Sequence, residues 1–239
     1  MTTIDVLMPV AGNAYAATAP AYLDTYRPAF AAHGLTLNGV PWDEAAGTAD
    51  ATLALFAWGY HLDVVRWEEV LARWPSDRPL LNPPSLLRWN TRKTYLFELA
   101  DRGVPIVPSI FGDADEDSAA RAFDAFGCDE LVIKPQVSGG SHKTVRVRRG
   151  ESVAPLSDAI LQPFLQAVGD EGELSLLFVG GLFSHAVRKV AAAGEFRIQP
   201  QFGGVLTRFK PAPEQLAQAK RVVAALPAPP LYARSIFCG

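Results

Sequence analysis

The sequence predicts a mixed fold, in which an α/β region with a parallel, Rossmann-like sheet is followed by an α+β region with antiparallel strands. Three observations lead to this prediction. The first 80 residues alternate short apolar runs with helical patterns, which is typical of a parallel sheet with crossover helices. Asn82-Pro83-Pro84 then interrupts regular structure. Further on, Gly180-Gly181 separates two long apolar runs, which is a strong signal of a two-residue β-hairpin.

The first region is expected to contain three strands and two helices. The strands are predicted over Ile4–Met8, Thr36–Val40 and Leu53–Ala57, and the helices over Ala21–Ala32 and Val64–Trp74. The second helix carries its apolar residues on one stripe, which indicates that it packs on a sheet. Because strands and helices alternate, the sheet is predicted to be parallel.

The rest of the chain is expected to mix helices with antiparallel strands. The helices are predicted over Thr91–Arg102, Ser118–Phe126 and Pro213–Leu226, with Thr91 as the cap of the first helix and Gly103 as its stop. The strands are predicted over Glu130–Pro135, Lys143–Arg148, Leu174–Val179, Leu182–Val190 and Leu231–Phe237. We therefore divide the chain into a Rossmann-like domain at 1–84, a central subdomain at 85–157 and a C-terminal subdomain at 158–239.

Composition narrows the class of function. Of the 239 residues, 49% are hydrophobic and 20% are charged, which is typical of a globular protein. The formal net charge of −3 argues against a general binder of nucleic acid or of anionic membranes, because such binders need a basic excess. The two cysteines lack metal-ligand spacing, and the sequence shows neither a signal peptide nor a membrane span. We expect a cytoplasmic protein, and a homodimer is left open.

Two lysines and a small-residue loop are candidates for phosphate binding. Lys134 ends an apolar strand beside a proline, where its charge needs a partner, and a phosphate explains it better than exposure to water. The loop that follows can bring backbone N–H groups close to phosphate oxygens, although most such loops are only turns. Its small residues are Ser138, Gly139, Gly140 and Ser141. Lys93, taken alone, is interpreted as a surface lysine.

Two later segments carry further candidates. Gln162, Pro163, Phe164 and Leu165 interrupt an apolar strand, where proline leaves backbone groups unpaired. An adenine ring can use such groups while Phe164 and Leu165 cover its faces; the alternative is a core strand with an edge proline. Glu173 begins the next strand, where its carboxylate either accepts hydrogen bonds from ribose hydroxyls or is solvated.

Cationic residues gather in the following hairpin region. Strand alternation places Arg188 and Lys189 on opposite faces, so that one can face a cleft and the other solvent. Arg197 has a fixed fork of donors suited to γ-phosphate or acyl-phosphate oxygens, and Gln199 lies two residues further on. The alternative is a surface strand with solvated charges.

Taken in order, these residues resemble the ATP-grasp superfamily. The order is a helix lysine, a strand lysine, a Gly/Ser loop, Gln-Pro-Phe, an acidic residue, Arg-Lys and Glu-Phe-Arg-Ile-Gln. Trp58-Gly59-Tyr60 and the segment Trp89–Lys93 are similar to the family's entry segment. The chain most resembles glutathione-synthetase-like, ribosomal-protein glutamate-ligase-like and cycloserine-biosynthesis-type ligases, and the resemblance covers nearly the whole chain.

The resemblance implies an ATP-grasp fold and a role for each candidate. Lys93 and Lys134 would contact the phosphates of ATP, beneath a mobile loop at 138–141. The segment 162–165 would line the adenine site and Glu173 would hold the ribose. Arg197 and Lys189 are implied in catalysis, with Gln199 near the γ-phosphate. ATP and Mg²⁺ are the implied cofactors, and the partner is a small carboxylate or amino-acid-like substrate that reacts with an amine through an acyl phosphate.

The sequence departs from the family pattern after Tyr232-Ala233-Arg234. The family continues with carboxylates that hold Mg²⁺, whereas Ile236 stands where the first of these ligands is expected and the chain ends at Gly239. We expect a C-terminally truncated form without these metal ligands. Two functions remain: an ATP-dependent carboxylate–amine ligase, or a non-catalytic nucleotide-binding remnant or pseudoenzyme. A dinucleotide-dependent oxidoreductase is disfavoured, because Gly12 stands alone where that fingerprint needs three glycines.

Overall fold

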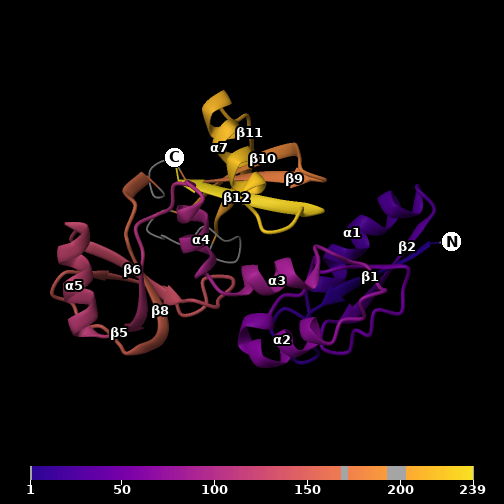
Figure 1. Ribbon diagram of the computed structural model, residues 1–239, viewed down its shortest axis with the longest axis horizontal. Coiled ribbons are helices and arrows are strands. Elements are labelled where there is room, and N and C mark those ends of the chain that lie inside the picture. Colours follow the sequence, from indigo (N-terminus) through magenta and orange to yellow (C-terminus); the bar gives the residue numbers. More distant parts are fainter. Residues whose placement is uncertain (1, 168–171, 193–202, 239) are drawn as a thin grey trace. The chain divides into compact units, whose positions relative to one another are not determined.

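The computed structural model describes residues 2–167, 172–192 and 203–238 (Figure 1). The chain forms two compact units, Met1–Thr91 and Arg92–Gly239. The second unit holds two separate sheets, and one strand, β8 (Leu156–Pro163), runs across the predicted boundary between residues 157 and 158. The division into three domains therefore stays a prediction.

The first unit is built on a four-stranded sheet in the order β2-β1-β3-β4. All its pairs are parallel, as the sequence predicts, whereas its fourth strand was not predicted. Its strands are β1 (Thr2–Met8), β2 (Leu35–Pro41), β3 (Ala51–Leu53) and β4 (Leu80–Leu81). The predicted strand Leu53–Ala57 is wrong after its first residue. Phe56 and Ala57 are buried by packing outside the sheet, and burial alone gives a loop and a strand the same apolar pattern.

Helices cover both faces of this parallel sheet (Figure 1). They are α1 (Ala19–Ala31), the 3₁₀ helix η1 (Tyr60–Leu62) and α2 (Val64–Ala72). The helix α2 begins where the Asp63 carboxylate accepts a hydrogen bond from the Arg66 N–H, 3.1 Å away. It buries Trp67 and Val70 against the sheet, which confirms the predicted amphipathic stripe.

The segment that enters the second unit contains two helices where the sequence predicts one. They are α3 (Pro84–Thr91) and α4 (Tyr95–Asp101). The Asn-Pro-Pro break is followed at once by a helix because proline is well tolerated at a first helical position. Thr91 ends α3 instead of capping the next helix: its hydroxyl donates to the Leu87 carbonyl at 2.9 Å and accepts from the Trp67 indole at 3.0 Å.

One sheet of the second unit has the order β5-β8-β6-β7 and is antiparallel. Besides β8, its strands are β5 (Ile110–Ala114), β6 (Glu130–Pro135) and β7 (Val145–Arg148). The helix α5 (Glu116–Phe126) covers one face, where Phe123 packs with Leu131 and Ile133 (Figure 1). The Asp115 carboxylate caps α5 by accepting from the Ser118 N–H at 2.8 Å. The predicted strand Glu130–Pro135 is confirmed.

The other sheet has the order β11-β10-β9-β12 and is also antiparallel. Its strands are β9 (Glu173–Val179), β10 (Leu182–Val190), β11 (Val205–Phe209) and β12 (Tyr232–Cys238). The helix α7 (Pro213–Ala224) covers the face that carries Leu174, Leu176 and Phe178 (Figure 1). Gly180 and Gly181 have φ angles of 56° and 77°, the left-handed conformations that a tight two-residue hairpin requires.

Candidate functional site

Strand register places several candidates on one face of the sheet β5-β8-β6-β7. Leu131 and Ile133 are buried against α5, so alternation turns Val132 and Lys134 of β6 to the opposite face. Val132 is the register partner of both Gln162 in β8 and Arg146 in β7. Lys134, Gln162 and Arg146 therefore share one face, which we call the face away from α5.

Lys93 lies in the short connection between α3 and α4, and it forms hydrogen bonds with the segment that follows β6. Its backbone N–H donates to the Gln136 carbonyl at 3.0 Å. Its ammonium group donates to the Ser138 hydroxyl at 2.8 Å, to the Ser138 carbonyl at 3.2 Å and to the Gln136 carbonyl at 3.3 Å. The interpretation of Lys93 as an exposed surface lysine is wrong, because these partners lie more than 40 residues away and bury it in part.

Burial, together with the positive charge of Lys134, lowers the pKa of Lys93 to about 8. Burial is the larger cause, because it disfavours the charged amine. Lys134 lies two residues before Gln136, whose carbonyl accepts from the backbone N–H and the ammonium group of Lys93. Two neighbouring ammonium groups in a partly desolvated place form a site that attracts an anion, and a chain of phosphates is such an anion.

The loop between β6 and β7 is tightly turned. The His142 N–H donates to the Gly139 carbonyl and the Thr144 N–H to the Ser141 carbonyl, each at 3.1 Å. Ser141 and Lys143 have positive φ angles of 61° and 50°, which residues other than glycine seldom adopt. Such conformations cost free energy and cluster at ligand clamps and switch regions. The loop is therefore held by Lys93 at its start and strained near its end.

The segment predicted to line the adenine site continues the sheet instead of breaking it. β8 is a central strand that runs through Pro163, and the next N–H, that of Phe164, donates to the Glu130 carbonyl at 2.9 Å. The Phe164 N–H is thus already paired, contrary to the predicted gap in the ladder. The Gln162 side chain is buried and donates to the Ser109 hydroxyl at 2.8 Å, and Leu165 follows directly after Phe164.

Glu173 and Lys189 form an ion pair across β9 and β10. The Lys189 ammonium lies 2.7 Å from the Glu173 carboxylate, which also accepts from the Ser175 hydroxyl at 3.2 Å. The Lys189 side chain is 13% exposed and that of Glu173 is 18% exposed, so the pair is partly shielded from water. By alternation from Leu174, the pair lies on the sheet face away from α7.

Arg188 points to the other face of β10, which agrees with the predicted alternation. Its guanidinium carbon lies 4.8 Å from the ring centroid of Phe209, a residue that packs against the core beneath α7. Arg188 therefore packs on an aromatic ring beside the core, whereas Lys189 pairs with a carboxylate on the opposite face. The predicted residues Arg197 and Gln199 fall outside the residues that the structure describes.

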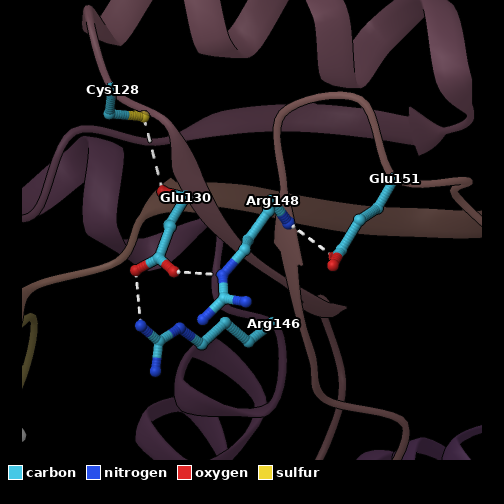
Figure 2. A network of polar contacts seen from close by, with 5 residues as sticks. All are labelled: Cys128, Glu130, Arg146, Arg148 and Glu151. Carbon is cyan, nitrogen blue, oxygen red and sulfur yellow. Dashed lines mark hydrogen bonds and ion pairs between the residues drawn. The ribbon is translucent and has the colours of Figure 1, made fainter.

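Sequence analysis missed Arg146 and Glu130. Both lie on the face away from α5, and Figure 2 shows their side chains in contact, with Arg148 on the same carboxylate. The signal was the alternation Val145-Arg-Val-Arg148, which turns both arginines to the face that carries Lys134. It was overlooked because the strand pairing of β7 with β6 has to be known before that face can be named.

In residues 2–167, 172–192 and 203–238, no group of three or more His, Cys, Asp or Glu side chains is placed to hold a metal ion. No helix in the same ranges has the length and apolar character needed to cross a membrane.

Solved structures of several ligases resemble this chain. The crystal structure of the D-cycloserine synthetase DcsG has a TM-score of 0.79 at 23% identity and covers 98% of this chain and 86% of that chain. A D-alanine–D-alanine ligase from Bacillus anthracis has a TM-score of 0.68 at 13% identity, with coverage of 100% and 83%. The ATP-grasp ligase PsnB in complex with a minimal precursor has a TM-score of 0.64 at 16% identity, with coverage of 99% and 85%.

Among curated proteins, the cycloserine biosynthesis protein DcsG from Streptomyces lavendulae is 34% identical over 126 residues. That alignment covers 47% of this chain and 42% of the relative, so the chain matches less than half of the relative's length. No protein-family model matches the chain. The structural likeness confirms the mixed α/β class and the ATP-grasp fold that the order of residues predicts.

Proposed function

We propose that the chain binds ATP and uses it to join a carboxylate to an amine. The observation that carries the proposal is that the Lys93 ammonium group donates to Ser138, at the start of the loop, while the positive charge of Lys134 acts on it. The two ammonium groups would hold phosphate oxygens, and the N–H groups of Gly139, Gly140 and Ser141 would close over them. The likeness to ligases of the same fold supports this assignment.

The proposed chemistry has two steps. A carboxylate oxygen of the substrate attacks the γ-phosphorus, the bond to the bridging oxygen breaks, and ADP leaves with that electron pair. The neutral amine then attacks the acyl carbon, phosphate leaves, and the amide nitrogen releases a proton to solvent. The lysines contribute by orienting the phosphates and by neutralising their charge. Mg²⁺ would add to that neutralisation, and we assign no ligand to it among the described residues.

The remaining predicted roles fit around this core. The base would lie against the segment 162–165, where Gln162 is fixed by Ser109. The Glu173 carboxylate already accepts hydrogen bonds from Lys189 and Ser175, and a carboxylate has about four lone-pair sites, so a ribose hydroxyl can still be accepted. Arg197 and Gln199 stay predicted contacts of the γ-phosphate and the acyl phosphate, and Lys189 stays a predicted catalytic residue.

Calorimetry with Mg-ATP, followed by assays of ADP and phosphate release, tests the proposal. We expect saturable binding by the wild type, and a loss of affinity of about tenfold or more in Lys134→Met, because a charge-assisted contact to phosphate is removed. Release of ADP and phosphate should depend on added amino acids or small carboxylates. Binding without such release would favour the non-catalytic alternative, and absence of binding would refute the proposal.

The second substrate is proposed to approach at Trp58, in the first unit. In the order β2-β1-β3-β4 the strand order reverses between β1 and β3, because β2 is added on one side of β1 and β3 on the other. Ligands of parallel sheets bind beyond the carboxyl ends of the strands at such a point. Trp58 follows β3 there, with its ring centroid 5.4 Å from that of Tyr22 and 6.4 Å from that of Tyr15. Tyr60 instead packs on the core residue Trp67, with ring centroids 5.4 Å apart.

Trp58→Ala is therefore expected to weaken binding of the carboxylate or amine substrate about tenfold, while the affinity for ATP stays unchanged. The reason is the loss of a large, half-buried contact surface that a substrate would share. Michaelis constants for substrate and for ATP give the comparison, and Trp58→Phe, which keeps a ring, is the matched control. An unchanged substrate constant in Trp58→Ala would remove this site from the proposal.

A further inference from the structure

Glu130 connects two elements at the base end of the proposed nucleotide site. Its backbone carbonyl accepts from the Phe164 N–H at 2.9 Å, which fixes the chain just after β8. Its carboxylate accepts from the guanidinium groups of Arg146 and Arg148 (Figure 2). One residue at the start of β6 therefore holds both the segment that follows β8 and two arginines of β7.

Arg146 in turn contacts the ring of Phe164. The guanidinium carbon lies 3.7 Å from the ring centroid, which is a close cation–π stack. The Arg146 side chain is 30% exposed and its register partner is Val132, so it lies on the face that also carries Lys134 and Gln162. The backbone of Phe164 is thus held by Glu130, and its ring is held by Arg146.

The Glu130 carboxylate stays ionised at neutral pH. Hydrogen bonds from Arg146, and then from Arg148, lower its pKa below the ordinary value for a glutamate. The charge-assisted contact that orients Arg146 therefore persists under the conditions in which a ligase works. Arg148 shares this carboxylate but differs in place, because its side chain is 69% exposed.

We propose that Arg146 is a positioning residue for the nucleotide base: held by Glu130, it fixes the ring of Phe164 so that the ring presents one wall to the purine. The inference rests on the proposed binding of ATP and concerns the base end of the site only. A phenylalanine ring that is free to rotate about its side-chain torsions has to be ordered when a base arrives, and that ordering costs affinity. A ring already stacked on a planar guanidinium avoids the cost, and lysine lacks the planar group that does this.

The test compares Arg146→Met, Arg146→Lys and the control Arg148→Met, using calorimetry with Mg-ATP and with Mg-tripolyphosphate, a probe that has no base. We expect Arg146→Met to lower the affinity for ATP about tenfold and to leave that for tripolyphosphate unchanged. Arg146→Lys should recover only part of the loss, because it restores the charge without the stack. Arg148→Met also removes one positive charge that pairs with Glu130, and it should leave both affinities within about twofold of the wild type.

A double-mutant cycle with Phe164→Leu decides whether Arg146 acts through the ring. In the Phe164→Leu background, Arg146→Met should cause little further loss of ATP affinity. Equal losses for ATP and tripolyphosphate, equal effects of Arg146→Met and Arg148→Met, or full additivity with Phe164→Leu would each overturn the inference. The Arg146→Lys arm gives the same comparison if Arg146→Met folds poorly. Failure of the wild type to bind ATP would instead refute the proposed function itself, which separates the two results.

Discussion

The Lys93→Met variant is expected to lose affinity for ATP by one to two orders of magnitude. The wild-type ammonium group already lies at the loop that begins with Ser138, so a phosphate arriving there meets an oriented donor. Methionine keeps an unbranched apolar side chain but offers neither charge nor hydrogen bonds, and each 1.4 kcal/mol lost lowers affinity tenfold. Calorimetry with Mg-ATP gives the measurement. Lys220→Met, at an exposed position on α7, is the matched control and should bind as the wild type does.

The same substitution should change how stability depends on pH. In the folded chain the pKa of Lys93 is lowered from 10.5 to about 8, so between these values the unfolded chain binds the extra proton and the free energy of unfolding rises with pH. Relative to Lys93→Met, the wild type should therefore gain on the order of 1–3 kcal/mol between pH 8 and pH 10.5. Urea unfolding at pH 7.5 and pH 10.5 measures it. A difference that stays constant would show that Lys93 is not desolvated.

Gly172→Ala is expected to destabilise the second unit by about 2–4 kcal/mol, which is a large part of the usual stability of a domain. Gly172 has a φ angle of 85°, and a Cβ atom there would lie 2.4 Å from the backbone carbonyl oxygen of Lys189. The clash involves backbone, so no side chain can move aside. Either β9 or β10 has to shift, and the pair of Glu173 with Lys189 joins the same strands.

Thermal unfolding and calorimetry with Mg-ATP together check this prediction. The control is Gly150→Ala, because Gly150 also has a positive φ of 90° but an added Cβ would meet nothing within 4 Å. The control should show only the cost of a left-handed residue, about 1 kcal/mol. If both variants unfold at the same temperature, the close approach of Gly172 to Lys189 contributes nothing beyond backbone conformation.

The fold was predictable where local signals decide it. The strand Glu130–Pro135 was found because an apolar run ends in charge and proline, and the hairpin at Gly180-Gly181 because only glycine adopts both turn conformations readily. The separation of α3 from α4 was missed because proline reads as a stop, whereas Pro84 begins a helix. The early end of β3 was missed because Phe56 and Ala57 are buried although the parallel ladder ends at Leu53.

The candidate site was predictable only in part, because its contacts join distant segments. Lys134 was proposed from its own strand, whereas the partial burial of Lys93 depends on Ser138, 45 residues away. The place of Arg146 depends on the pairing of β7 with β6 and on the contact with Phe164, and neither can be read from the sequence. The order of residues suggested the superfamily without these contacts, because that order follows the succession of helices and strands along the chain and does not depend on tertiary contacts.

The three hydrogen bonds from the Lys93 amine to Gln136 and Ser138 have one more consequence. A bound phosphate would accept hydrogen bonds from the same N–H groups of Lys93 that now bind the loop. The ligand and the loop would therefore compete for one ammonium group. Recognition at this point is then an exchange of acceptors, in which the incoming oxygens replace those of the protein. The strength of the hydrogen bonds between Lys93 and the loop thereby limits how tightly an anion can be held. The loop is released from Lys93 only when an anion accepts those hydrogen bonds in its place.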